Sequence, residues 1–306
     1  MFAVLLQPVS SHLAAHTGNG ISEDRLYPPG PPPDAPSISC AAPLSPADSL
    51  ARKSPPGSFF RRAVTPPDHP AALRLGIWAA LSIAEGLAAY EKTIEVWGKP
   101  SGKFHLKRDA VGDRMALTDE ASHLFIAYKL TQAARLGYRW SGLSPSTAVR
   151  AGAIQAGLYM LAVEFPLDAY NPAQGFGISD FIADLVGVGL AWYRAGRSAP
   201  RWDLKISVKS QFFRGDHRLI AHTDKQYDDY IYWLTYRVSA HRYDPLVVGI
   251  GYSTHHAFGQ PPNKELHFCL GTSFSEIGRM IGRRTELALS PAELYFWGIG
   301  PRVHWR

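Results

Sequence analysis

The chain has 306 residues, of which 46% are hydrophobic, so it can bury a real core and is long enough for two modest domains. Its net charge is +6 and its pI is near 9.3, but the basic residues are scattered, with only short pairs such as Arg61-Arg62. This pattern argues against nucleic acid as a partner and fits a membrane-facing or solvated surface better. Cys40 and Cys269 lie too far apart in the sequence to indicate a zinc motif or a disulfide framework.

Residues 1–70 are rich in proline, with the densest run at 27–33 (YPPGPPP), and poor in bulky apolar side chains. Such a segment cannot bury enough surface to offset its ordering entropy, so we predict that it is disordered. The first residues contain no basic segment and only a very short apolar run, which argues against a standard signal peptide.

The first predicted helix covers 71–92 and is interrupted mainly by Arg74 and Glu85. Its length would cross a bilayer, whereas the acid inside it argues for caution. A core helix of a soluble protein and a membrane helix therefore both remain open for this segment.

A loop is predicted over 97–113, where Gly98, Pro100 and Gly102 lie close together. The second helix is predicted over 118–137, with Thr118 or Asp119 as its cap and apolar residues at helical spacing.

The third helix has a strong start signal, with Ser144 as the cap and Pro145 at the first helical position. It is predicted to run to Val163, and its small residues permit close contact between helices. The fourth helix is predicted over 179–195, with Ser179 and Asp180 at its cap.

Beyond residue 202 the hydrophobic period changes from 3.6 to 2, which indicates strands. Leu204, Ile206 and Val208 alternate with polar residues, and further strands are predicted at 230–239, 246–254, 265–274 and 294–303. We therefore predict an α+β fold, in which a bundle of about four helices is followed by an antiparallel sheet of about five strands. The predicted regions are 1–70 (disordered), 71–198 (helical, membrane-associated or soluble) and 199–306 (β).

Asp119 and His123 are four residues apart and therefore share one face of the second helix. A carboxylate beside an imidazole is used in acid-base catalysis and also behind metal ligands. The structural alternative is a helix cap beside a histidine at a partly wet interface.

More acids follow at the end of the third helix and on the fourth. Glu164 ends an apolar helix, Asp168 follows across a proline, and Asp180 and Asp184 lie one turn apart. If the chain reverses after Glu164, these acids can meet His123 and supply enough ligands for a hard or borderline divalent metal. Asp184 lies between apolar residues, so its burial requires a partner such as His123 or Arg150; of these acids it is the one expected to stand apart from the pocket.

Four segments in this order resemble the YfiM-like family of bacterial proteins: 104–109 (FHLKRD), 119–128 (DEASHLFIAY), 164–168 (EFPLD) and 175–180 (GFGISD). That family is a domain of unknown function that is often described as a predicted periplasmic lipoprotein. The helical part also distantly resembles the VanZ-like membrane family, with Glu120 in place of a lysine and Asp184 in place of an asparagine. The resemblance implies a bacterial cell-envelope protein and no established activity.

Two functions follow as hypotheses. The first is a non-enzymatic envelope protein with a structural or binding role at a membrane, whose partner is a membrane or envelope component. The second is a metal-assisted hydrolase acting on an envelope lipid or glycan, with His123, Glu164, Asp168 and Asp180 around the metal and Asp119 as a further catalytic candidate. The sequence does not identify a cofactor.

Overall fold

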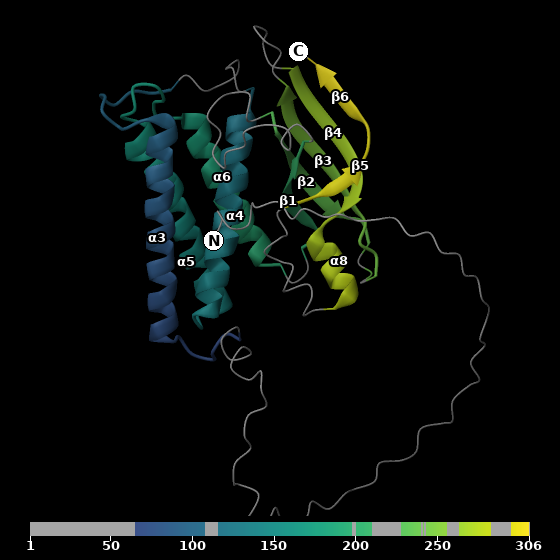
Figure 1. Ribbon diagram of the computed structural model, residues 1–306. Helices are drawn as coiled ribbons and strands as arrows, with labels where there is room; N and C mark the ends of the chain where they lie inside the picture. The colour runs from purple at the N-terminus through teal and green to yellow at the C-terminus, as the bar shows by residue number, and fades with distance from the viewer. Residues whose placement is uncertain are drawn as a thin grey trace, which may run out of the picture. The chain divides into compact units, whose positions relative to one another are not determined.

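The computed structural model describes residues 65–107, 116–197, 200–209, 228–239, 241, 243–255, 263–282 and 295–305. Helices come first and an antiparallel sheet follows, so the predicted α+β class is confirmed (Figure 1). The disorder predicted for 1–70 falls mostly on 1–64, which lies outside the described residues, as do Cys40 and Arg61-Arg62.

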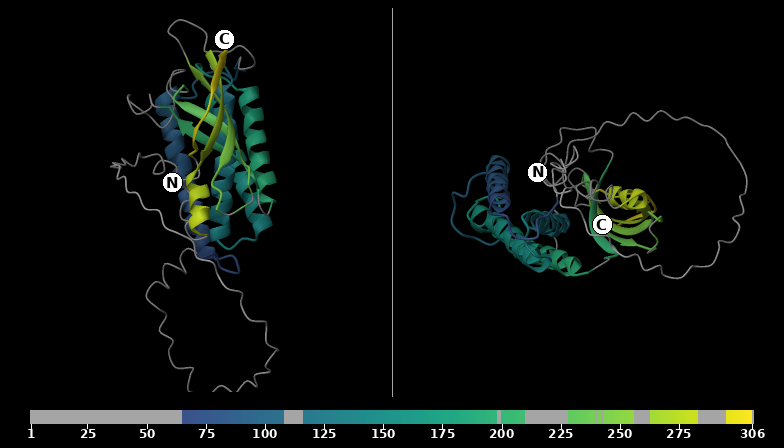
Figure 2. Two further views of the ribbon diagram at one scale, coloured as in Figure 1. Left: turned by 90° about the vertical axis from the view of Figure 1, so that its right-hand side faces the viewer. Right: turned by 90° about the horizontal axis from the view of Figure 1, so that it is seen from below.

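The helices of the first half run side by side in the views of Figures 1 and 2. They are α3 (Ala72–Trp97), α4 (Thr118–Trp140), α5 (Pro145–Ala162) and α6 (Ile178–Ala195), and the short π-helix η2 (Val163–Asp168) extends α5. Helix α4 packs against both α5 and α6. A Cβ atom on Gly152 of α5 would lie 2.7 Å from the backbone nitrogen of Arg135, so this small residue allows the close contact that its type predicts.

The start of α5 agrees with its sequence signal, whereas the starts of α4 and α6 do not. The Ser144 hydroxyl accepts a hydrogen bond from the Thr147 backbone nitrogen at 3.2 Å, as a cap should. Helix α4 follows Leu117, which has a left-handed backbone (φ 69°), and α6 follows Gly177; neither has a side-chain cap. The predicted caps are therefore wrong, because those polar side chains bind other partners in the interior.

The strands form one curled antiparallel sheet in the order β1-β2-β3-β4-β5, with β6 also paired to β4 (Figure 2). Their bounds are β1 Trp202–Val208, β2 Tyr230–Arg237, β3 Val247–His255, β4 Asn263–Thr272, β5 Trp297–Ile299 and β6 Arg302–Trp305. The register places Leu204, Leu234, Ile250 and Phe268 side by side across four strands.

Two details of the sheet differ from the prediction. The predicted strand 294–303 is divided into β5 and β6, because Pro301 has no backbone N–H to donate and its carbonyl instead accepts from Phe268 at 3.0 Å. The chain after β4 forms helix α8 (Phe274–Ile281) rather than a longer strand. Glu276 in its first turn binds Arg237 of β2 at 2.6 Å, which ties this helix to the sheet.

One face of the sheet carries glycines that lie beneath large aromatic rings. Gly249 and Gly251 lie beneath aromatic rings: a Cβ on Gly251 would lie 2.6 Å from the Trp233 ring, and one on Gly249 would lie 3.0 Å from the Phe296 ring. Leu204 joins Phe125 and Tyr128 of α4 in an apolar cluster that connects helices and sheet.

Candidate functional site

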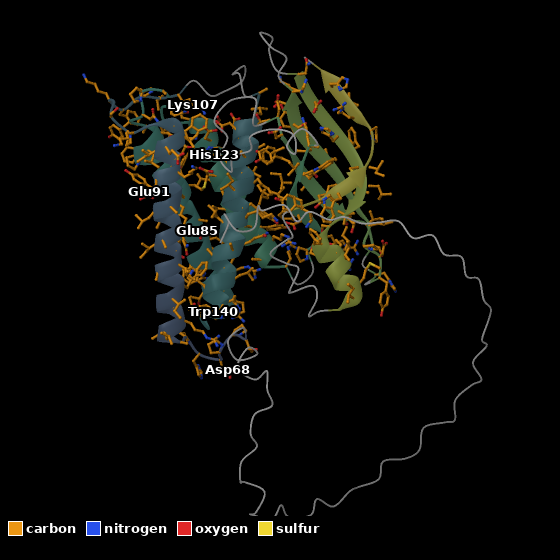
Figure 3. The ribbon with its side chains drawn as sticks, in the orientation of Figure 1. Asp68, Glu85, Glu91, Lys107, His123 and Trp140 are labelled. Carbon is orange, nitrogen blue, oxygen red and sulfur yellow. The ribbon has the colours of Figure 1, made fainter. Side chains whose placement is uncertain are left out.

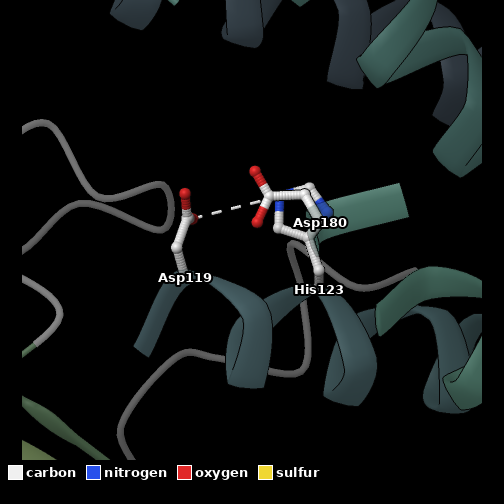
Figure 4. A group of neighbouring side chains, drawn as sticks. All are labelled: Asp119, His123 and Asp180. Atoms are coloured by element: carbon white, nitrogen blue, oxygen red, sulfur yellow. Dashed lines mark ion pairs between the residues drawn. The ribbon is translucent and has the colours of Figure 1, made fainter. Parts of the chain in front are cut away.

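Acidic side chains from three segments converge on one histidine. Helix α4 carries Asp119 and His123 one turn apart, η2 supplies Glu164, and α6 supplies Asp180 and Asp184, also one turn apart. Figure 4 shows the first pair together with Asp180. The chain reversal after Glu164 that this arrangement requires is present.

The local sequence explains why the reversal occurs at this position. Phe165 leaves the helical region (φ −145°, ψ 113°) and precedes Pro166, which cannot continue the hydrogen-bond ladder of a helix. Glu164 is thereby buried at the turn, where its Oε2 accepts a hydrogen bond from the Gly177 backbone nitrogen at 3.1 Å. This bond connects the end of α5 to the start of α6.

His123 contacts acids on both sides of its ring. Its Nδ1 lies 3.2 Å from Asp184 Oδ1 and 3.5 Å from Glu164 Oε1. Its Nε2 faces Asp119 Oδ1 at 4.0 Å. The sequence suggested that Asp184 would stand apart from the site. This expectation is wrong, because Asp184 makes the shortest of these contacts to His123.

Lys107 is a member of the site that the sequence analysis missed. Its Nζ lies 2.6 Å from Asp119 Oδ2 and 3.0 Å from Asp180 Oδ2. Backbone bonds between Lys107 and Phe176, and between Phe176 and His105, hold this loop beside the start of α6. Burial alone would lower the pKa of the Lys107 ammonium, but the charges of Asp119 and Asp180 outweigh it and raise the pKa. Figure 3 labels Lys107 and His123 near the same end of the helices.

Several oxygens of the site are buried but incompletely bonded. Glu164, Asp180 and Asp184 are at most 3% exposed. Within the described part of the chain, Glu164 Oε1, Asp180 Oδ1 and Asp184 Oδ2 accept no hydrogen bond. Because such groups are costly in an interior, they indicate that protons or a cation complete the site.

Two further predicted residues, Asp168 and Ser179, do not contribute ligand atoms to this cluster. Asp168 is partly buried, and its backbone carbonyl accepts from Gly175 at 2.9 Å, but its carboxylate lies outside the sets of ligand atoms described below. Ser179 was predicted as a cap; it instead donates to Glu120 Oε1 at 2.8 Å and joins α6 to α4.

Among the described residues, two sets of side chains place one ligand atom each within 4.8 Å of one another: Asp119, His123 and Asp180, and His123, Glu164 and Asp184. An imidazole nitrogen with two carboxylate oxygens suits borderline divalent ions such as Zn²⁺ or Mn²⁺. His123 belongs to both sets, so its loss would affect either site.

No protein-family model, curated protein or solved structure matches this chain. The resemblance to the YfiM-like and VanZ-like families therefore stays a prediction that rests on the quoted segments.

Proposed function

We propose that the protein is a component of the bacterial cell envelope with a structural or binding role at a membrane, and that α3 and the exposed apolar faces of its neighbouring helices lie against lipid. The observation that supports this proposal is an inverted distribution of polarity. Large apolar side chains lie on the outside of these helices, while acids, hydroxyls and small residues lie inside.

Helix α3 carries the strongest form of this inversion. It is the one helix in the described part of the chain that is long and apolar enough to cross a membrane. Only 6% of the 18-residue window that makes it so is buried in the protein. A core helix of a soluble protein would be mostly buried. Its exposed apolar residues are Leu73, Leu75, Ile77, Leu81, Ile83, Leu87 and Tyr90.

Two polar residues in the middle of α3 face the neighbouring helices instead. Ser82 is buried, its hydroxyl accepts a hydrogen bond from Gln155 at 3.0 Å, and its carbonyl accepts one from the Tyr159 hydroxyl. Glu85, three residues along the same face, lines a hollow together with Gln155 and Tyr159. The acid that argued against a membrane helix in the sequence therefore faces the neighbouring helices and is only partly exposed.

Helix α6 repeats the same inversion. Asp180, Asp184 and Gly187 lie on the buried side, whereas Ile182 is 55% exposed and Leu185 is 54% exposed. Helix α5 likewise buries Gly152 and Ala156 and exposes Ile154 and Leu158, among others. In water, each large apolar side chain left exposed forgoes roughly 1.5–3 kcal/mol of burial free energy, whereas acyl chains provide the missing contact.

The proposal is tested by attaching a nitroxide spin label to single cysteines in protein reconstituted into phospholipid vesicles. Cys40 and Cys269 are first replaced by serine, and the label is placed at Ile83, Ile182 or, as a control, the exposed loop residue Lys103. At Ile83 and Ile182 we expect strong relaxation by oxygen and weak relaxation by a water-soluble nickel chelate. The control should show the reverse.

Strong nickel access at all three positions would contradict a lipid-facing surface. Recovery of the full-length protein in the soluble fraction of cells after a high-salt wash would contradict membrane placement altogether.

A metal-assisted hydrolase acting on an envelope lipid or glycan is a second candidate, favoured by the convergence of His123 with Glu164 and Asp184. A metal with an open coordination position activates water. The test is hydrolysis of phospholipid vesicles and glycan fragments with Mn²⁺ present. A metal-dependent rate that His123→Ala removes would support the hydrolase, and equal rates in both proteins would contradict it.

A further inference from the structure

We propose that His123, Glu164 and Asp184 bind one borderline divalent cation, such as Mn²⁺ or Zn²⁺, between η2, α4 and α6. This site is independent of whether the helices lie in a bilayer and of whether the protein catalyses a reaction. The three ligand atoms are His123 Nδ1, Glu164 Oε1 and Asp184 Oδ1.

The first argument concerns a single ring nitrogen that faces two carboxylate oxygens. His123 Nδ1 carries at most one proton, and it lies within hydrogen-bond distance of Asp184 Oδ1. Glu164 Oε1, at 3.5 Å from the same nitrogen, is buried and accepts no hydrogen bond within the described part of the chain. A cation replacing that proton would satisfy all three atoms together.

The second argument is that groups behind these ligands already orient them. Asp119 Oδ1 lies 4.0 Å from His123 Nε2, longer than a hydrogen bond, so its charge favours a proton on Nε2 when a metal occupies Nδ1. The Gly177 backbone nitrogen holds Glu164 Oε2 and thereby directs Oε1 toward the histidine. Metal-binding histidines commonly have such a carboxylate behind them.

The third argument selects between the two possible sets of ligands. Lys107 Nζ occupies the space between Asp119 and Asp180, so that pair already has a cation. Glu164 and Asp184 contact only His123 among the cationic side chains of the described residues. The set with Glu164 and Asp184 is therefore the one that lacks positive charge.

Charge balance within the described residues leads to the same conclusion. Asp119, Glu164, Asp180 and Asp184 face two cations, Lys107 and a protonated His123. If these four acids are ionised, two negative charges are in excess in a buried place, which is unfavourable, and Asp168 nearby adds to the excess. A dication bound to neutral His123 reduces the excess by one charge.

The test is equilibrium titration of the full-length protein, purified in detergent and stripped with EDTA, with Mn²⁺ and with Zn²⁺. We expect one ion per chain. Glu164→Gln and Asp184→Asn preserve shape while removing a charged ligand, and each should weaken binding by roughly 100-fold; Asp119→Asn should weaken it by roughly 10-fold. Asp180→Asn and the exposed control His255→Ala should change affinity by less than threefold. Thermal unfolding in EDTA establishes that each variant is folded.

The absence of ion binding by the folded wild-type protein would overturn the proposal, as would unchanged binding in Glu164→Gln and Asp184→Asn. Strong loss in Asp180→Asn with none in Asp184→Asn would assign the ion to the other set and also overturn it.

Discussion

Two buried clusters of charged groups differ in which sign is in excess. Around His123, acids outnumber cations, and three buried oxygens accept no hydrogen bond within the described residues. In the second cluster one acid, Asp203 of β1, is surrounded by Lys205 at 3.1 Å, Lys129 at 3.5 Å and Arg194 at 3.6 Å. The Tyr128 hydroxyl donates a further hydrogen bond to it at 2.6 Å.

This difference in charge indicates that the cluster around Asp203 is structural, whereas the cluster around His123 is short of positive charge. Burial alone would raise the pKa of Asp203, but the charges of Lys129, Lys205 and Arg194 outweigh it and hold the pKa well below its ordinary value of 3.8. Asp203 is therefore ionised and fully bonded, and it connects α4 and α6 to the first strand. In the cluster around His123, Lys107 compensates only Asp119 and Asp180, which is why we propose an external cation beside Glu164 and Asp184.

The largest effect is expected when the structural cluster is broken. Asp203→Asn leaves three cations close together in a buried place, so it should lower the free energy of unfolding by about 3–5 kcal/mol. Chemical denaturation of the detergent-solubilised protein measures this loss. Because Asp203 lies outside the proposed metal site, Mn²⁺ should stabilise the variant and the wild type equally, and unequal stabilisation would show that the two clusters are coupled.

A somewhat smaller effect is expected when the incomplete cluster is filled. A ligand that binds only the folded state stabilises it by about 2.7 kcal/mol at 100 times its dissociation constant. Mn²⁺ at that ratio should therefore raise the unfolding temperature of the EDTA-treated wild type but leave that of His123→Ala unchanged. An equal rise in both proteins would place the ion elsewhere.

Lys107→Met removes the internal cation from the acid-rich cluster. Asp119 and Asp180 would then lack their shortest ionic contacts, so the metal-free protein should lose about 1–3 kcal/mol of stability. Added Mn²⁺ should recover part of this loss because it reduces the excess negative charge. If the variant unfolds at the same temperature as the wild type in EDTA, the lysine does not compensate these acids.

The smallest effect is a pH dependence that originates in Asp203. Because the pKa of Asp203 is lower in the folded than in the unfolded state, its contribution is present above about pH 4 and is lost as pH falls through the folded-state pKa. From pH 5 to pH 2 the wild type should therefore lose more stability than Asp203→Asn, as chemical denaturation at each pH measures. Parallel pH profiles for the two proteins would contradict the assigned charge state.

The sequence predicted the elements well where local signals are strong. The Ser144-Pro145 start and the alternation after residue 202 specified α5 and β1 correctly. Helix α8 was missed, although Ser273 and Glu276 have the spacing of a capping box; the strand predicted over 265–274 overlaps only its first residue, and no element was predicted over 275–293. Local pattern cannot say where a strand ends when an amphipathic helix follows directly.

The site was predictable in part, because helical spacing brings Asp119 together with His123 and Asp180 together with Asp184. The role of Lys107 was not, since it depends on a loop that pairs with the start of α6 through Phe176. The inward direction of Asp184 was missed for a related reason: the sequence shows apolar neighbours but not which side of α6 faces the protein.

The most direct test of the central claim is anomalous X-ray diffraction from crystals of the protein soaked with Zn²⁺, with data collected on both sides of the zinc absorption edge. The account predicts one strong peak at roughly 2.0–2.2 Å from His123 Nδ1 and from carboxylate oxygens of Glu164 and Asp184. A peak between Asp119 and Asp180 with Lys107 displaced, or zinc bound only at exposed histidines, would contradict it.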